Sequence, residues 1–109
     1  MTRIGAGAAS GFMSDSVNVK AVRVRIEGRV QGVWFRAWTA EEAKSRGLRG
    51  WVRNRPDGTV EAVFAGTPEA VDDMVQACWK GPPLAQVRKV TVAAAEDPGG
   101  RGFGQMPTT

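Results

Sequence analysis

Residues 22–47 have the sequence VRVRIEGRVQGVWFRAWTAEEAKSRG, in which the spacing of the apolar residues changes halfway. The first five residues alternate valine or isoleucine with arginine, which is the pattern of a half-buried β-strand. From Phe35 onward, apolar or small residues recur every four positions, and Gly47 stands where helices commonly stop. This stretch therefore predicts a strand, a glycine-containing loop over 27–33 and a helix over 34–46.

The rest of the sequence predicts two strands, a second helix and a further strand. A short strand over 51–54 and a longer one over 59–65 flank a Pro-Asp-Gly turn and together form a hairpin. Thr67 and Pro68 suit the N-cap and the first turn of a helix. The apolar stripe of that helix has the i, i+3, i+4, i+7, i+8 spacing, at Val71, Met74, Val75, Cys78 and Trp79. A Gly-Pro-Pro sequence ends the helix, and the last clear strand is expected over 87–94.

The order of elements is βαββαβ, as in two split βαβ units with right-handed crossovers. We therefore expect an α+β fold, a ferredoxin-like sandwich in which two helices cover one face of a four-stranded antiparallel sheet. The glycine-rich sequence around Phe103 predicts a short, weak fifth strand at an edge. Residues 1–18 are rich in glycine, alanine and serine and are expected to be a disordered N-terminal extension. Residues 19–109 are expected to form a single domain.

Several residue types that carry common enzyme chemistry are missing. The sequence contains no histidine and no tyrosine, and its one cysteine is Cys78. The absence of histidine removes the commonest general base near neutral pH and all Ser-His and Cys-His nucleophile pairs. One cysteine can form neither an intramolecular disulfide nor a thiolate zinc site. Because Cys78 falls on the apolar stripe of the second helix, we interpret it as a structural thiol.

The charge is unevenly distributed along the chain. The net charge is +4, and residues 19–60 alone carry ten Lys or Arg against four Asp or Glu. Such an excess suggests an anionic partner, either a small phosphate compound or a nucleic acid. No apolar run approaches the ~18 residues that a membrane-spanning helix needs. A single cysteine is typical of a reducing compartment, so a cytoplasmic location is expected.

The loop between the first strand and the first helix has the residue types of an anion site. A helix N-terminus leaves its first N–H groups unpaired and carries a partial positive charge. Gly28 and Gly32 would allow the backbone to curl around an anion. Arg36, in the first helical turn, has a guanidinium that matches two phosphate oxygens. On these residues alone, an ordinary connection with a solvated arginine is an equal alternative.

Two longer motifs go beyond a generic glycine loop. Residues 28–36 are GRVQGVWFR, and residues 50–54 are GWVRN, followed by an Asp-Gly turn. The acylphosphatase family carries G-x-V-Q-G-V-x-F-R after its first strand and G-W-V-x-N shortly beyond it. The chain resembles this family over roughly residues 19–94, in both motifs, in their spacing and in the order of elements.

The resemblance implies an enzyme that hydrolyses acyl phosphates, the mixed anhydrides of a carboxylic acid and phosphoric acid, to a carboxylate and inorganic phosphate. It implies that Arg36 and the loop amides bind the phosphoryl group and that Asn54 orients the attacking water. The loop residues concerned are Gly28, Arg29, Val30, Gln31, Gly32 and Val33. No metal and no cofactor are expected. We expect a monomer that takes a small acyl phosphate as its substrate, with no nucleic acid and no membrane as partners.

An alternative is a non-catalytic ferredoxin-like module that binds nucleic acid or a protein partner through its basic face. Nucleic-acid modules often stack bases on aromatic side chains of their sheet, and the expected central strands lack such a platform. The glycine-rich C-terminal sequence departs from the family pattern, whose last strand alternates apolar residues. This departure bears on the stability of the sheet edge and not on the loop.

Overall fold

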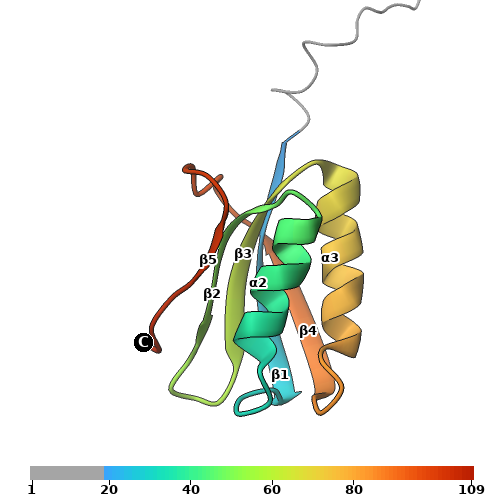
Figure 1. The fold of residues 1–109 in the computed structure, drawn as a ribbon, viewed down its shortest axis with the longest axis vertical. Coiled ribbons are helices and arrows are strands. Elements are labelled where there is room, and N and C mark those ends of the chain that lie inside the picture. Colours follow the sequence, from blue (N-terminus) through green and yellow to red (C-terminus); the bar gives the residue numbers. More distant parts are fainter. Residues whose placement is uncertain (1–18) are drawn as a thin grey trace, which may run out of the picture.

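The structure is a computed structural model that describes residues 19–109 (Figure 1). Its elements are β1 (Lys20–Arg29), α2 (Phe35–Ser45), β2 (Arg49–Asn54), β3 (Val60–Gly66), α3 (Pro68–Lys80), β4 (Gln86–Ala94) and β5 (Phe103–Gln105). The predicted βαββαβ order is confirmed. The strand β1 is longer than its apolar alternation suggested, because backbone pairing with β4 continues to Arg29. The disorder expected for residues 1–18 lies outside the described residues.

Four strands form the expected antiparallel sheet in the order β4-β1-β3-β2, and both helices cover the same face of it (Figure 1). Apolar residues and arginines alternate along β1, so successive side chains point to opposite faces of the sheet. Val22, Val24 and Ile26 are buried under the helices, whereas Arg23 and Arg25 are exposed on the helix-free side. We call this second side the open face.

The fifth strand corrects the expectation of a purely antiparallel sheet. β5 pairs in parallel with β2, so the five-stranded sheet is mixed. The cause is the path of the chain, because residues 95–102 cross from the β4 edge to the opposite edge and then reverse direction (Figure 1). A strand that runs opposite to β4 at that edge must run parallel to β2.

Phe103 anchors this short strand in the core. Its side chain is buried and stacks on Phe64 with the ring centroids 5.5 Å apart. Glycine is required beside this pair at Gly50, because a Cβ there would overlap the backbone carbonyl of Val63 in the neighbouring strand β3. The last strand is therefore short but well anchored.

The helix α3 follows its predicted pattern with one exception. The side chain of Thr67 accepts a hydrogen bond from the Ala70 N–H at 3.2 Å, which confirms the N-cap. Met74 and Cys78 are fully buried, as expected for the apolar stripe. Trp79, however, is 47% exposed. It lies one residue beyond Cys78, and this step turns its side chain to the margin of the stripe.

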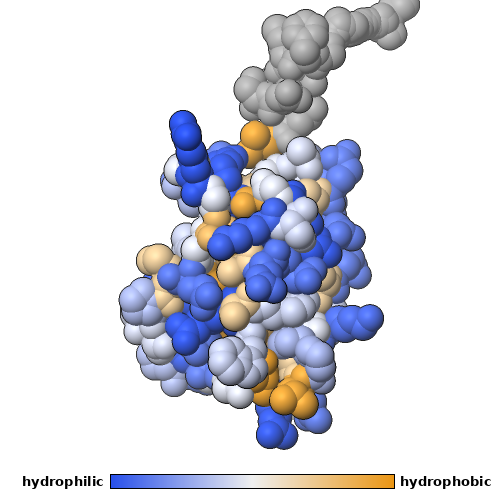
Figure 2. Space-filling view, viewed as in Figure 1, coloured by the Kyte–Doolittle hydropathy of each residue, from blue (hydrophilic) through white to orange (hydrophobic). Residues whose placement is uncertain are grey.

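The surface over the two helices is mostly hydrophilic (Figure 2). Hydrophobic surface gathers at the lower end of this view, where Figure 1 places the connection between α3 and β4 beside the loop that precedes α2. Within residues 19–109, neither helix is long and apolar enough to span a membrane.

Candidate active site

The loop between β1 and α2 is anchored by its own apolar side chains. Val30 is fully buried and Val33 is 6% exposed, so both side chains belong to the core. Between them Gly32 has φ +75°, which glycine adopts without strain. Trp34, the N-cap of α2, has a left-handed backbone (φ 66°, ψ 23°), which costs a bulky residue about 1–3 kcal/mol. The core contacts of Val33 and Phe35 on either side hold the chain in this conformation.

No acidic side chain and no side-chain cap occupies the N-terminus of α2. Trp34 offers no side-chain cap, and the first turn contains no acidic residue. The first backbone hydrogen bond runs from the Trp38 N–H to the Trp34 carbonyl at 2.9 Å. The N–H groups of Phe35, Arg36 and Ala37 therefore have no intrahelical acceptor. Their partial positive charge and the Arg36 guanidinium favour an anion at this helix end.

A pocket at this end of the sheet brings together residues from three parts of the chain. It has a volume of about 450 Å³ and is lined by Gly32, Trp34, Phe35, Arg36, Ala37, Asn54 and Gln105. Asn54 is the last residue of β2, which ends at the same end of the sheet where α2 begins (Figure 1). The structure thus places Gly32, Arg36 and Asn54, three of the predicted site residues, around one cavity.

The C-terminal segment contacts both predicted catalytic residues. Nη1 of Arg36 donates a hydrogen bond to the Met106 carbonyl at 3.3 Å. The Met106 N–H donates to the Val52 carbonyl at 2.8 Å, and the Thr109 N–H donates to the Asn54 carbonyl at 3.4 Å. These contacts continue the pairing of β5 with β2. Sequence reasoning missed Met106, and no motif could have revealed it, because it acts through its backbone carbonyl.

Gln31 joins the loop to the turn that follows Asn54. Its side-chain Nε2 donates to the carbonyl oxygens of Arg55 and Thr59, each at 2.8 Å. In the same turn Asp57 accepts hydrogen bonds from the Thr59 hydroxyl and N–H at 2.7 and 3.0 Å. These bonds, with a further contribution from Arg25, lower the pKa of Asp57. The Gln31 side chain is therefore occupied, and only its backbone N–H remains for the predicted phosphate contact.

Gly28 and Arg29 lie apart from the pocket lining. They form the end of β1, opposite Val87 and Gln86 of β4. Gly28 has φ +129°, and a Cβ there would lie 2.8 Å from the backbone nitrogen of Arg88, so glycine is required for the strand pairing. The side chain of Arg29 is exposed. Phosphate binding by the amides of these two residues stays a prediction.

The acylphosphatase family model matches residues 22–104, which span the loop, both catalytic candidates and most of β5. The chain belongs to the acylphosphatase family. It is 53% identical over 90 residues to an acylphosphatase from Rhodospirillum rubrum, covering 83% of this chain and 99% of that protein. It is 52% identical over 92 residues to one from Rubrobacter xylanophilus, covering 84% of each chain.

Solved acylphosphatases have the same fold. The structure of an acylphosphatase from Coxiella burnetii is similar with a TM-score of 0.82 and 29% identity, covering 87% of this chain and all of that one. An acylphosphatase from Bacillus subtilis is similar with a TM-score of 0.77 and 36% identity, covering 81% of this chain and 98% of that one. These similarities confirm the ferredoxin-like α+β fold expected from the sequence.

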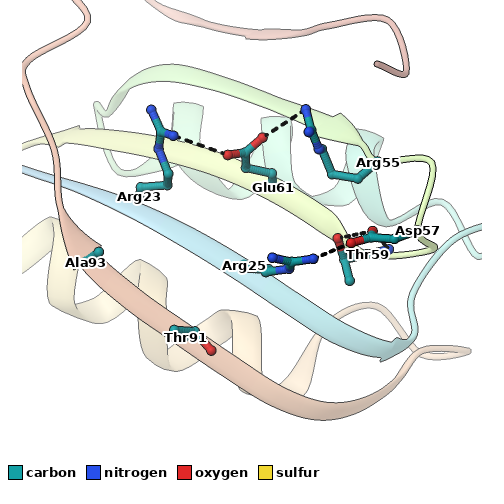
Figure 3. Close-up of a pocket in the computed structure, with 8 residues that line it drawn as sticks. All are labelled: Arg23, Arg25, Arg55, Asp57, Thr59, Glu61, Thr91 and Ala93. Carbon is teal, nitrogen blue, oxygen red and sulfur yellow. Dashed lines mark hydrogen bonds and ion pairs between the residues drawn. The ribbon is translucent and has the colours of Figure 1, made fainter.

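A second cavity of this acylphosphatase-family chain lies on the open face, away from Arg36 and Asn54. It has a volume of about 320 Å³ and is lined by Arg23, Arg25, Arg55, Asp57, Thr59, Glu61, Thr91 and Ala93 (Figure 3). The three arginines that line this cavity form ion pairs (Figure 3). Arg25 pairs with the carboxylate of Asp57, and a guanidinium nitrogen of each of Arg23 and Arg55 lies 3.6 Å from a carboxylate oxygen of Glu61. Arg53 also pairs with Glu61, at 2.9 Å. Four arginines thus share two carboxylates, so the ion pairs offset part of the basic character expected there and leave an excess of positive charge.

The thiol of Cys78 has no place in the active site of this acylphosphatase-family chain. It is fully buried in α3, and burial raises its pKa to about 12. It is therefore protonated at neutral pH, as the interpretation of a structural thiol requires. Among residues 19–109 there is no group of three or more His, Cys, Asp or Glu side chains that could hold a metal ion.

Proposed function

We propose that this chain hydrolyses acyl phosphates to a carboxylate and inorganic phosphate in the pocket formed by the β1–α2 loop, Arg36 and Asn54. The observation that supports this proposal is the meeting of Arg36 and Asn54 around one cavity at an uncapped helix N-terminus. The activity is that of the family to which the chain belongs.

In this proposal, the substrate phosphoryl group lies against the N-terminus of α2. The loop amides donate hydrogen bonds to its oxygens, and the guanidinium of Arg36 contacts two of them at once. Binding would exchange the 3.3 Å bond from Arg36 to the Met106 carbonyl for a charge-assisted bond to phosphate. Phosphoryl transfer passes through a loose transition state, so positioning and charge stabilisation supply most of the acceleration.

Asn54 would hold the attacking water through its side-chain amide. The water oxygen forms a bond to phosphorus, and the bond from phosphorus to the acyl oxygen breaks with its electron pair going to the carboxylate. The carboxylate is a good leaving group and needs no strong general acid. A phosphate oxygen accepts the proton of the water, which suits a pocket whose lining contains no histidine or carboxylate.

The proposal includes no metal and no cofactor, because the loop amides and Arg36 supply the positive charge that a metal would otherwise provide. We further propose that the protein is a monomer in the cytoplasm with small acyl phosphates as its substrates. Nucleic acid is not part of the proposal, which needs only one small anion in the pocket of Arg36 and Asn54.

The test is hydrolysis of benzoyl phosphate with EDTA present, by the wild type and three arginine variants. Loss of one preorganised donor costs about 10²–10³ in kcat, so Arg36→Ala should fall by at least this factor. Arg36→Lys should also fail, since an ammonium keeps the charge but cannot match two oxygens.

The matched control is Arg101→Ala, because this side chain is exposed, lies outside the phosphate-binding loop and is not part of the pocket lining. Arg101→Ala should keep wild-type activity. An Arg36→Ala variant that is folded and as active as Arg101→Ala would remove Arg36 from the mechanism.

A further inference from the structure

Trp34 is a large aromatic side chain that the core does not use. It is 80% exposed, more than any of the other exposed large hydrophobic residues, of which Leu84 at 71% comes next. It nevertheless lines the same pocket as Arg36 and Asn54. An indole placed in water at the entrance of a catalytic pocket is available to contact whatever enters it.

The backbone holds Trp34 in this position. It is the one non-glycine residue with positive φ among residues 19–109. The side chains of Val33 and Phe35, on either side, are anchored in the core. Phe35 also packs edge-on against the partly buried Trp38, with the ring centroids 5.3 Å apart. The position of Trp34 relative to Arg36 is therefore set by the start of α2.

The pocket is larger than a phosphoryl group needs. Its volume of about 450 Å³ falls in the range of about 300–1,000 Å³ that is usual for small-molecule sites. A phosphoryl group held by the helix N-terminus and Arg36 would occupy one part of this space. The acyl group is joined to the phosphorus through a single oxygen, so it must lie in the space that is left.

In-line displacement decides which lining residues the acyl group can meet. The leaving carboxylate must lie on the side of phosphorus away from the water, hence away from Asn54. Of the lining residues other than Asn54, Trp34 is the large apolar side chain that is exposed, since Phe35 is buried. Flat aromatic groups are favoured by an indole face, through offset-stacked or edge-to-face contacts.

We propose that Trp34 binds the acyl group of the substrate and makes the enzyme prefer aromatic acyl phosphates over small aliphatic ones. This inference rests on the proposed function of the pocket. It adds a specificity-determining residue outside the phosphate-binding and water-orienting groups.

The experiment compares kcat/KM for benzoyl phosphate and acetyl phosphate in the wild type and three variants. Trp34→Asn removes the ring with a residue that tolerates the left-handed backbone, and Trp34→Phe keeps an aromatic ring. The matched control is Trp79→Asn, since Trp79 is also partly exposed but lies at the end of α3, outside the pocket.

Trp34→Asn should lower kcat/KM for benzoyl phosphate by about threefold to tenfold, the range of one aromatic contact, and change that for acetyl phosphate by less than about twofold. Trp34→Phe should keep most of the preference, and Trp79→Asn all of it. An equal fall for both substrates would mean that Trp34 acts only on the loop conformation, and wild-type kcat/KM for both substrates would mean that the indole contacts neither. Either result leaves the ratio of the two kcat/KM values unchanged and would overturn the inference.

A binding measurement separates this inference from the proposed function. Calorimetry with phenylphosphonate and with inorganic phosphate needs no turnover. Trp34→Asn should weaken phenylphosphonate and leave phosphate unchanged. If the wild type hydrolysed neither acyl phosphate, the proposed function would fail, and the phosphonate comparison would still decide whether the indole recognises an aromatic group. If Trp34→Asn changed the affinity for phenylphosphonate and for phosphate by the same factor, the inference that the indole recognises an aromatic group would be contradicted.

Discussion

The side-chain amide of Gln31 donates a 2.8 Å hydrogen bond to the carbonyl oxygen of Thr59 and a second one, of the same length, to that of Arg55. Gln31 belongs to the loop that leads to Arg36, and the turn it contacts directly follows Asn54. Arg36 and Asn54, which we propose act on the same phosphorus atom, are thus linked through an amide that hydrogen-bonds to neither of them. Gln31 is in this sense a positioning residue.

Replacing Gln31 by alanine should disturb both stability and catalysis. Each of the two carbonyl groups would lose one of its two donors and keep a backbone N–H, from Gly58 to the Arg55 carbonyl and from Arg55 to the Thr59 carbonyl. The cost is that of two hydrogen bonds, about 1–3 kcal/mol in the free energy of unfolding. Because the loop and the turn would then move independently, kcat should fall more than the affinity for phosphate. Urea unfolding, steady-state kinetics and phosphate inhibition measure the three quantities. A folded variant with wild-type kcat would limit Gln31 to a structural role.

Asn54 should affect turnover more than binding. Asn54→Ala removes the amide that we propose orients the water, while Arg36 and Gly32 of the loop stay in the pocket lining. We expect kcat to fall by about 10²–10³, with little change in the inhibition constant of phosphate. Asn54→Asp should in addition weaken phosphate binding, because it places a negative charge in the pocket. A phosphate affinity lost in parallel with kcat in the alanine variant would assign Asn54 to binding instead.

The pH dependence of the reaction should be flat across neutrality. The pocket lining contains no histidine, carboxylate, cysteine, tyrosine or lysine that could act as a general base. If a phosphate oxygen takes the proton of the water, the reaction needs no such base, and no bell-shaped pH profile is expected near neutrality. Measurement of kcat over this range tests the point. A sharp bell centred near neutral pH would require a general base that the pocket does not contain.

Cys78 should be dispensable for activity but not for stability. Cys78→Ala leaves a small cavity under α3 and should cost about 1–2 kcal/mol at pH 7, with kcat unchanged. Burial raises the pKa of the folded thiol to about 12, above the value of about 8.5 in an unfolded chain. The stabilisation is therefore complete below pH ~8.5. Above it the unfolded state loses its thiol proton first, and stability falls as the pH rises toward the folded pKa.

The difference in unfolding free energy between the wild type and Cys78→Ala isolates the contribution of the thiol, because the other titrating groups are the same in both proteins. The advantage of the wild type over Cys78→Ala should shrink by about 1.4 kcal/mol per pH unit above pH ~9. An advantage that stays constant up to pH 10 would show that the thiol is not buried as described. Loss of kcat in a folded Cys78→Ala variant would contradict its structural role.

Local patterns were sufficient to predict the elements that carry them. Alternation identified β1, and the spacing of Val71, Met74 and Cys78 identified α3 with its buried face. Trp79 was expected on the buried stripe but is partly exposed. It lies at the margin of the stripe, where burial depends on the neighbouring parts of the chain and not on the spacing within the helix. The parallel pairing of β5 was also missed, since three residues are too few for a periodicity and their direction depends on the path of residues 95–102.

The site could be predicted only as far as its motifs extend. The two motifs identified Arg36 and Asn54, and the structure brings both to one pocket. They gave no indication that the Gln31 side chain would contact the turn instead of phosphate, or that Met106 would contact Arg36. Both contacts join residues far apart in the sequence through backbone carbonyls, and any residue type offers a carbonyl.

In the proposed reaction, water attacks the phosphorus of an acyl phosphate in the pocket of Arg36 and Asn54. The decisive experiment is hydrolysis of benzoyl phosphate in ¹⁸O-labelled water, with EDTA present and Arg36→Ala in parallel. We expect rapid turnover that is lost in the variant, with the label in inorganic phosphate. Label in the benzoate would mean that water attacks the carbonyl carbon instead. That result, or no hydrolysis by the folded wild-type protein, would rule out attack at phosphorus in this pocket.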